Sequence, residues 1–277
     1  MKKVLIFGGT HGNEWTGIWL VKKYGEYFKQ KYPDLSLEFI IANPEAYKLN
    51  KRFKDEDLNR AFQFLNESRP GSFEHQRARE LRNQILSEEC FVIDLHTTTS
   101  AMGKTLILTD YNPLVLWLAR QIQTKIADSR IIGSPDPNKK YLASQVVSSL
   151  MIEVGPVANG VLDPHALEGT FELVDRLLLS LSTAPELPSG EIEVYVEVED
   201  VKYPLDKEGQ ISAYIHSGFQ GKDFTKIDGS YTPFRHFYGD EVTYKTLGPR
   251  YPIFINEAAY YPQHLAYTLC EKRVMTF

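Results

Sequence analysis

The chain has 277 residues, of which 43% are hydrophobic and 24% charged, and its formal net charge is -5. This composition is ordinary for a folded globular protein, and the sequence has no basic block of the kind that indicates nucleic acid as a partner. It also has no run of about 18 apolar residues, so it predicts no membrane span. The apolar run after Lys3 is too short for a secretory signal. We therefore expect a cytoplasmic protein.

Strand-like and helix-like segments alternate over the first two-thirds of the chain. Short apolar runs predict strands, and longer segments with apolar residues three or four positions apart predict helices. Such alternation is typical of an α/β domain with a parallel or mixed sheet. In chain order, the expected strands are 4–7, 37–42, 91–95, 105–109 and 151–154, and the expected helices are 14–31, 73–87, 113–128 and 164–182.

The pattern changes after a segment rich in Pro, Ser and Gly, residues 182–190, which predicts a linker. In residues 191–199, Ile and Val alternate with Glu, which predicts a strand with one wet face. We interpret these glutamates as a solvated face and not as part of a site. Further short strands are expected at 211–215, 242–247, 252–255 and 265–277. The sequence therefore predicts an α/β domain over residues 1–185 and a mainly β domain over residues 190–277.

The stretch GGTHGNEWTG, residues 8–17, follows the first expected strand directly. Its glycine spacing fits neither a Walker loop nor a dinucleotide fingerprint. In an open α/β sheet, ligands bind beyond the carboxyl ends of the strands, which is where His11 and Glu14 lie. A histidine and a carboxylate three positions apart suit zinc. The alternative is a tight turn followed by a glutamate that the helix dipole favours.

A third candidate ligand, His96, follows the expected strand 91–95. Together with His11 and Glu14 it completes the donor set of a catalytic zinc site with three protein ligands. Asp94, two residues earlier, is a candidate partner for an imidazole of the site.

Four further residues are candidates for the chemistry around such a metal. Glu153 ends the apolar strand 151–154, where a carboxylate is costly unless it is paired or functional, so it is a candidate general base. Arg52 can polarise a scissile carbonyl, and Asn59 and Arg60 can bind a substrate carboxylate through paired hydrogen bonds. The alternative for residues 51–62 is a solvated loop.

Five motifs resemble one known family over nearly the whole chain: GGTHGNEWTG, DEDLNRAF, VIDLHTTTSAMG, MIEVGP and INEAAYY, in this order. The sequence resembles the aspartoacylase/succinylglutamate desuccinylase family of zinc-carboxypeptidase-like hydrolases. The resemblance implies an α/β fold with a mixed sheet flanked by helices, and a smaller, mainly β C-terminal domain that narrows the substrate entrance. It implies a zinc-dependent amidohydrolase that deacylates a small N-acyl amino acid with one Zn2+ per subunit, and it leaves a homo-oligomer open.

The resemblance also implies a role for each candidate residue. His11, Glu14 and His96 would be the zinc ligands, and Glu153 the base that activates water. Arg52 would donate to the scissile carbonyl, and Asn59 and Arg60 would bind the α-carboxylate. Tyr141 and Tyr260 would contact the substrate, and Glu257 would order the pocket wall.

The sequence departs from the family pattern near the substrate side chain. Gln145 stands where mammalian-type members have an arginine, and residues 262–264, which end in His264, replace a pair of lysines. Lys139, Lys140 or His264 are candidates to compensate.

N-acetyl-L-aspartate is the expected substrate. The alternatives are another N-acyl amino acid, either aromatic or N-succinylglutamate, a small-peptide zinc carboxypeptidase, and a non-catalytic binding module. The capped entrance argues against the peptidase, and the complete set of candidate residues argues against the binding module.

Overall fold

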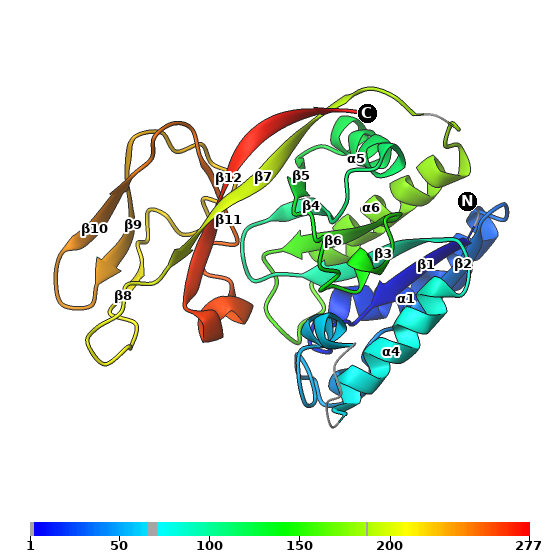
Figure 1. The fold of residues 1–277 in the computed structure, drawn as a ribbon, viewed down its shortest axis with the longest axis horizontal. Coiled ribbons are helices and arrows are strands. Elements are labelled where there is room, and N and C mark those ends of the chain that lie inside the picture. Colours follow the sequence, from blue (N-terminus) through cyan, green and yellow to red (C-terminus); the bar gives the residue numbers. More distant parts are fainter. Residues whose placement is uncertain (1–2, 66–70, 187) are drawn as a thin grey trace.

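The computed structural model describes residues 3–65, 71–186 and 188–277, which form a nine-stranded mixed sheet flanked by helices and a smaller three-stranded sheet (Figure 1). None of the helices in these residues is long and apolar enough to cross a bilayer. The strands of the large sheet are β1 (Lys3–Gly8), β2 (Ser36–Ile41), β3 (Cys90–Thr97), β4 (Gly103–Leu108), β5 (Ser129–Gly133), β6 (Ser149–Gly155), β7 (Glu191–Lys202), β11 (Tyr251–Ile253) and β12 (Leu265–Thr276).

The strand order of the large sheet is β11-β12-β7-β5-β4-β6-β3-β1-β2. Strands β2, β1, β3 and β6 run parallel to one another, whereas β4 runs antiparallel to β6. Strand β7 is parallel to β5 and antiparallel to β12. The expected mixed sheet is therefore confirmed, and the carboxyl ends of β1, β3 and β6 lie at one edge of it.

Helices cover both faces of this sheet. Apolar side chains of α1, α5 and α6 form one core with one face, and those of α3 and α4 form a second core with the opposite face. Helices α5 and α6 begin with a capping residue followed by proline: Asn112 accepts from the Val115 N–H at 3.1 Å, and Asp163 from the Ala166 N–H at 2.8 Å. These caps satisfy backbone donors that a helix start otherwise leaves free. The helices are α1 (Trp15–Lys31), α2 (Pro44–Lys48), α3 (Leu58–Ala61), α4 (Phe73–Leu86), α5 (Pro113–Lys125) and α6 (Pro164–Ser182), with 3-10 turns η1 (Phe62–Phe64), η2 (Ala143–Gln145) and η3 (Ala258–Gln263).

The smaller sheet lies at the end of the molecule away from the N-terminus, and the long strands β7 and β12 run from the large sheet toward it (Figure 1). It consists of β8 (Ala213–Ile215), β9 (Ser230–His236) and β10 (Glu241–Lys245), and its apolar side chains form a core with those of β7 and β12. Because these two strands also belong to the large sheet, the division into domains at residues 185–190 stays a prediction.

A bulge in β7 changes which side chains face each side of the sheet. Glu197 pairs with Cys270 and Glu199 pairs with Leu269, so Val198 has no opposite residue in β12. The expected alternation is therefore wrong at Val198, whose side chain is 40% exposed. A bulge of one residue exchanges the two faces for all residues beyond it.

Candidate functional site

The loop after β1 depends on glycines that allow backbone segments to approach closely. A Cβ atom on Gly8 would lie 2.3 Å from the carbonyl oxygen of Gly17, and one on Gly12 would lie 2.1 Å from the carbonyl carbon of Ala46. Only hydrogen fits at such distances. A tight turn, which was the alternative interpretation of residues 8–17, is therefore present. It holds His11 between β1 and α1.

We expect Gly12→Ala to lower the free energy of unfolding by about 1–3 kcal/mol, because the added methyl group displaces the backbone at Ala46. Gly239→Ala is the matched control, since a Cβ atom there meets nothing within 4 Å. Urea denaturation of the two variants measures the difference. Equal stability of both would contradict the close approach.

Three side chains converge at the carboxyl ends of β1 and β3. The Nδ1 atom of His11 lies 2.6 Å from Glu14 Oε1, and the Nδ1 atom of His96 lies 3.0 Å from Glu14 Oε2. One potential ligand atom from each residue lies within 4.8 Å of the others, and each residue is only 4% exposed. The cluster predicted from the sequence is therefore assembled in space.

Each imidazole presents its second nitrogen to another carboxylate. His96 Nε2 lies 2.8 Å from Asp94 Oδ2, and the hydroxyl of Thr10 donates to Asp94 Oδ1 at 2.7 Å. His11 Nε2 lies 3.4 Å from Asp57 Oδ1. A carboxylate behind an imidazole fixes its tautomer and makes the inward nitrogen a better metal ligand.

The electrostatics of the cluster also fit a cation. Burial alone would raise the pKa of Glu14, but the adjacent His11 and His96 outweigh burial and hold this pKa well below its usual range. Glu14 is therefore a carboxylate at neutral pH. With two imidazoles and one carboxylate, the three residues can hold a metal ion that accepts nitrogen and oxygen ligands.

Glu153 projects from β6 beside this cluster. It is the register partner of His96 in the parallel pair β3–β6, so both side chains point to the same face of the sheet. Burial raises the pKa of Glu153 well above its usual range, and the negative charges of Glu14 and Glu257 raise it further, although His96 opposes them. A raised pKa makes this carboxylate a stronger base toward a proton than an exposed glutamate is.

Arg52 reaches the site from the loop between α2 and α3. Its Nε atom donates to Asp57 at 3.0 Å, and its Nη1 atom lies 3.5 Å from Glu14. The buried carboxylate of Glu74, on α4, holds the same loop by accepting hydrogen bonds from the backbone N–H groups of three successive residues, Lys54, Asp55 and Glu56.

Asn59 and Arg60 follow on α3 and lie next to Tyr141. The side-chain oxygen of Asn59 accepts from the Leu142 N–H at 3.1 Å, and Asn59 lines the pocket. The Arg60 guanidinium lies 5.5 Å from the centre of the Tyr141 ring.

Gln145 has a structural role and does not line the pocket. Its side-chain nitrogen donates to the carbonyls of Lys139 and Tyr141, at 2.8 Å each, and so holds the loop that carries Tyr141. Likewise, Lys139, Lys140 and His264 do not line the pocket, and His264 ends η3 in the left-handed region with φ 53°. The expected compensation for the missing basic residues is not found at these positions.

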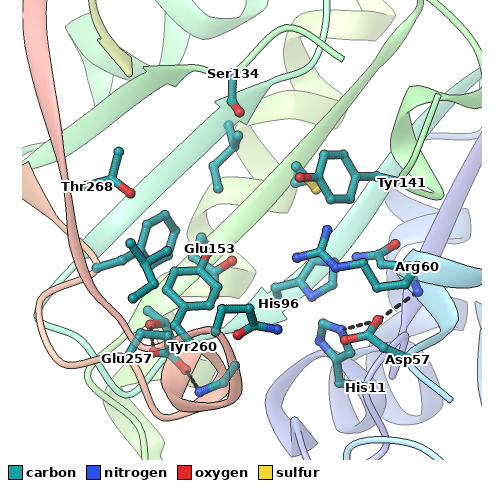
Figure 2. A pocket seen from close by; sticks show the side chains of 18 of the residues that line it. His11, Asp57, Arg60, His96, Ser134, Tyr141, Glu153, Glu257, Tyr260 and Thr268 are labelled. Carbon is teal, nitrogen blue, oxygen red and sulfur yellow. Dashed lines mark hydrogen bonds and ion pairs between the residues drawn. The ribbon is translucent and has the colours of Figure 1, made fainter. Parts of the chain in front are cut away.

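The wall of the site opposite His11 comes from η3. Glu257, at the start of this turn, is buried and accepts hydrogen bonds from the Thr99 N–H at 2.8 Å, from the Thr99 hydroxyl at 2.9 Å and from the Thr98 hydroxyl. These bonds attach η3 to the segment after β3 and so position Tyr260 over the pocket, as Figure 2 shows.

All nine residues predicted for the site line one pocket of about 460 Å³. Figure 2 shows His11, His96, Arg60 and Asp57 on one side of it and Tyr260 and Glu257 on another. Further lining residues were not predicted from the sequence: Asp57, which lies within the DEDLNRAF motif, and Ser134, Asp200, Lys202 and Thr268, which belong to no motif. Glu197, interpreted as part of a solvated face, is exposed as expected, but it is exposed to this pocket.

Two family models match the chain. The Succinylglutamate desuccinylase/Aspartoacylase catalytic domain matches residues 1–181, and the AstE/AspA barrel-sandwich hybrid domain matches residues 190–272.

Individual relatives cover almost the whole chain. It is 34% identical to a probable aspartoacylase from Trichodesmium erythraeum, over 98% of this chain and 97% of the relative. It is 33% identical to an N-acyl-aromatic-L-amino acid amidohydrolase (carboxylate-forming) from Xenopus laevis, over 99% and 95%. The structure of murine aminoacylase 3 matches with a TM-score of 0.89 at 30% identity, covering 99% of this chain and 96% of that one.

A more distant structure, a succinylglutamate desuccinylase from Vibrio parahaemolyticus, matches with a TM-score of 0.68 at 16% identity and shows the shared fold. The assembled donor cluster, the two family models and the full-length relatives all agree. The chain belongs to the succinylglutamate desuccinylase/aspartoacylase family of hydrolases.

Proposed function

We propose that this protein is a zinc-dependent amidohydrolase that removes a short acyl group from an N-acyl amino acid. The observation that carries the proposal is the convergence of a His-Glu-His donor cluster, Glu153 and Arg52 on a single pocket. Imidazole and carboxylate donors suit zinc, and the carboxylates behind both imidazoles are typical of zinc sites. One zinc ion per chain would be held by His11, Glu14 and His96.

When bound, zinc supplies a Lewis acid that polarises the amide carbonyl and makes water more acidic. Glu153 accepts a proton as the water oxygen bonds to the amide carbon, and it returns that proton to the nitrogen when the C–N bond breaks. Arg52 donates hydrogen bonds to the oxygen on which negative charge develops. Asp57 holds Arg52 in the orientation that this donation needs.

Asn59 and Arg60 bind the α-carboxylate of the amino acid in this proposal. The guanidinium supplies charge and a paired donor geometry, and the Asn59 NH2 group supplies another donor. Fixing the carboxylate orients the amide for attack. Tyr141 and Tyr260 then contact the substrate from opposite sides of the pocket (Figure 2).

N-acetyl-L-aspartate is the substrate expected from the sequence motifs. The pocket favours a second candidate, an N-acyl amino acid with a larger side chain, because Ile107, Met151 and Phe254 form an apolar part of its lining. The relative from Xenopus laevis, named for N-acyl-aromatic amino acids, supports this candidate. A pocket of about 460 Å³ suits a small molecule.

The test is turnover by the zinc-loaded protein on N-acetyl-L-aspartate, N-acetyl-L-glutamate, N-succinyl-L-glutamate, N-acetyl-L-phenylalanine and an unblocked dipeptide. We expect the N-acyl amino acids to be cleaved and the dipeptide to remain intact. Cleavage of the dipeptide alone would indicate a carboxypeptidase instead. If no compound were cleaved while zinc is bound, a non-catalytic binding protein would be the better description.

A further inference from the structure

Two carboxylates form a wall of the pocket at a distance from the donor cluster. Glu197 accepts a hydrogen bond from the Ser134 hydroxyl at 2.9 Å, and Asp200 accepts one from the Thr268 hydroxyl at 2.7 Å. All four residues line the pocket, and Figure 2 shows Ser134 and Thr268 on the side away from His11. We call Glu197 and Asp200 the acidic wall.

The β7 bulge brings both carboxylates to the same side of the sheet. Glu197 lies two residues after Tyr195, which belongs to the same apolar cluster as Ile107 and Met151 of the pocket face. Beyond Val198 the faces are exchanged, so Asp200 and Lys202 face the pocket, whereas Glu199 does not line it. The acidic wall is thus a consequence of the local strand geometry.

The acidic wall carries an excess of negative charge. Within residues 3–65, 71–186 and 188–277, no Lys, Arg or His side chain forms an ion pair with Glu197 or Asp200. Lys202 also lines the pocket, which leaves two carboxylates against one ammonium group. Partial burial raises the pKa of Glu197, and the negative charge of Asp200 raises it further although the Ser134 hydroxyl opposes them. A bound cation would relieve both effects.

The acidic wall lies within reach of a long side chain only. Between β6, which carries Glu153, and β7 lie strands β4 and β5, so three strand spacings, about 14 Å, separate their backbones. The apolar side chain of Ile107, on β4, lies between the two, and Met151 of β6 is its register partner. Burial raises the pKa of the Tyr260 phenol well above its usual range, and the negative charges of Glu153 and Glu197 raise it further.

We infer that the acidic wall selects N-acyl amino acids whose long side chain ends in a hydrogen-bond donor, above all an ammonium group, and disfavours those that end in a carboxylate. The aliphatic part of such a side chain would pack along Ile107 and Met151, and its end would bind between Glu197 and Asp200. This inference rests on the proposed function and names the substrate class of the same site.

The first measurement compares kcat/KM of the zinc-loaded protein on Nα-acetyl-L-lysine and N-acetyl-L-norleucine, which share a chain and differ by the ammonium group. We expect the lysine derivative to be preferred roughly ten- to hundredfold, the range for hydrogen bonds to charged groups. A second pair, N-acetyl-L-tyrosine and N-acetyl-L-phenylalanine, tests a hydroxyl donor. N-acetyl-L-aspartate is expected to be the poorest of the five.

Variants of the wall test whether it causes the preference. Glu197→Gln and Asp200→Asn keep size and shape but remove the charge, and each is expected to bring the lysine/norleucine ratio close to one. Glu199→Gln is the matched control, because it removes a charge from the same strand outside the pocket. The ratio in this control should stay that of the wild type, and melting temperatures show that each variant is folded.

Binding separates this inference from the proposed function. Calorimetric titration of the zinc-loaded Glu153→Gln variant with the same pairs of compounds measures the side-chain preference without turnover. Donor-selective binding without hydrolysis by the wild type supports the acidic wall and overturns the proposed function. Hydrolysis without any preference for a donor, or with a preference that survives Glu197→Gln and Asp200→Asn, overturns the inference alone.

Discussion

Glu153→Gln is expected to lower kcat by about 10²- to 10⁴-fold, the usual contribution of a general base. Glutamine occupies the same space beside His96 but cannot accept the proton of the attacking water. Because burial penalises the charged form of Glu153, removing this carboxylate should not destabilise the fold. The measurements are steady-state turnover, zinc content and thermal melting of the variant and the wild type.

The controls for this variant distinguish chemistry from folding. Unchanged zinc content and melting temperature, together with the loss of kcat, would assign the effect to proton transfer. Glu168→Gln changes an exposed glutamate on α6 outside this pocket and is expected to retain full activity. Turnover of Glu153→Gln within a few-fold of the wild type would remove Glu153 from the mechanism.

His11→Ala is expected to abolish stoichiometric zinc binding. The variant keeps only two of three ligands, so its zinc affinity should fall by more than the roughly 10- to 100-fold that loss of an outer partner costs. Zinc should then no longer raise the melting temperature, because a ligand stabilises a protein only through its affinity for the folded state. Metal analysis after dialysis and thermal melting with added zinc measure both effects.

Two further variants serve as comparisons for the loss of zinc binding in His11→Ala. Asp94→Asn removes the carboxylate behind His96 and is expected to weaken zinc binding roughly 10- to 100-fold, which is less than the loss of a ligand. His165→Ala removes an exposed histidine at the start of α6 and is expected to change nothing. If His11→Ala bound zinc as the wild type does, the assignment of the ligands would be wrong.

Strands β1, β3, β4 and β6 of the large sheet could be predicted from the sequence because they are buried on both faces and therefore appear as continuous apolar runs. Strand β5 was missed, since its five residues include only two large apolar side chains, Ile131 and Ile132, before Gly133. Strand β9 was missed because Pro233 stands in its middle, and proline argues against a strand unless it lies at a position without a ladder bond.

The part of the site that touches the donor cluster was predictable, because His11, His96 and Glu153 follow or end strands whose carboxyl ends meet at one edge. The outer part was not. Ser134 and Thr268 come from segments with no polar motif, and they reach the pocket only through the pairing of β5, β7 and β12. Glu197 was misjudged because alternation shows that a face is polar, not whether solvent or a pocket lies over it.

The single extra residue at Val198 determines how strand β7 responds to a change in its length. Deleting Val198 would remove the bulge but leave Asp200 and Lys202 facing the pocket, because they would then stand two and four positions after Glu197 in a regular strand. The acidic wall would keep both of its carboxylates, and the donor cluster of His11, Glu14 and His96, which lies outside β7, would keep its place. The bulge therefore takes up one residue of length in β7 without changing which of the other side chains of this strand line the pocket.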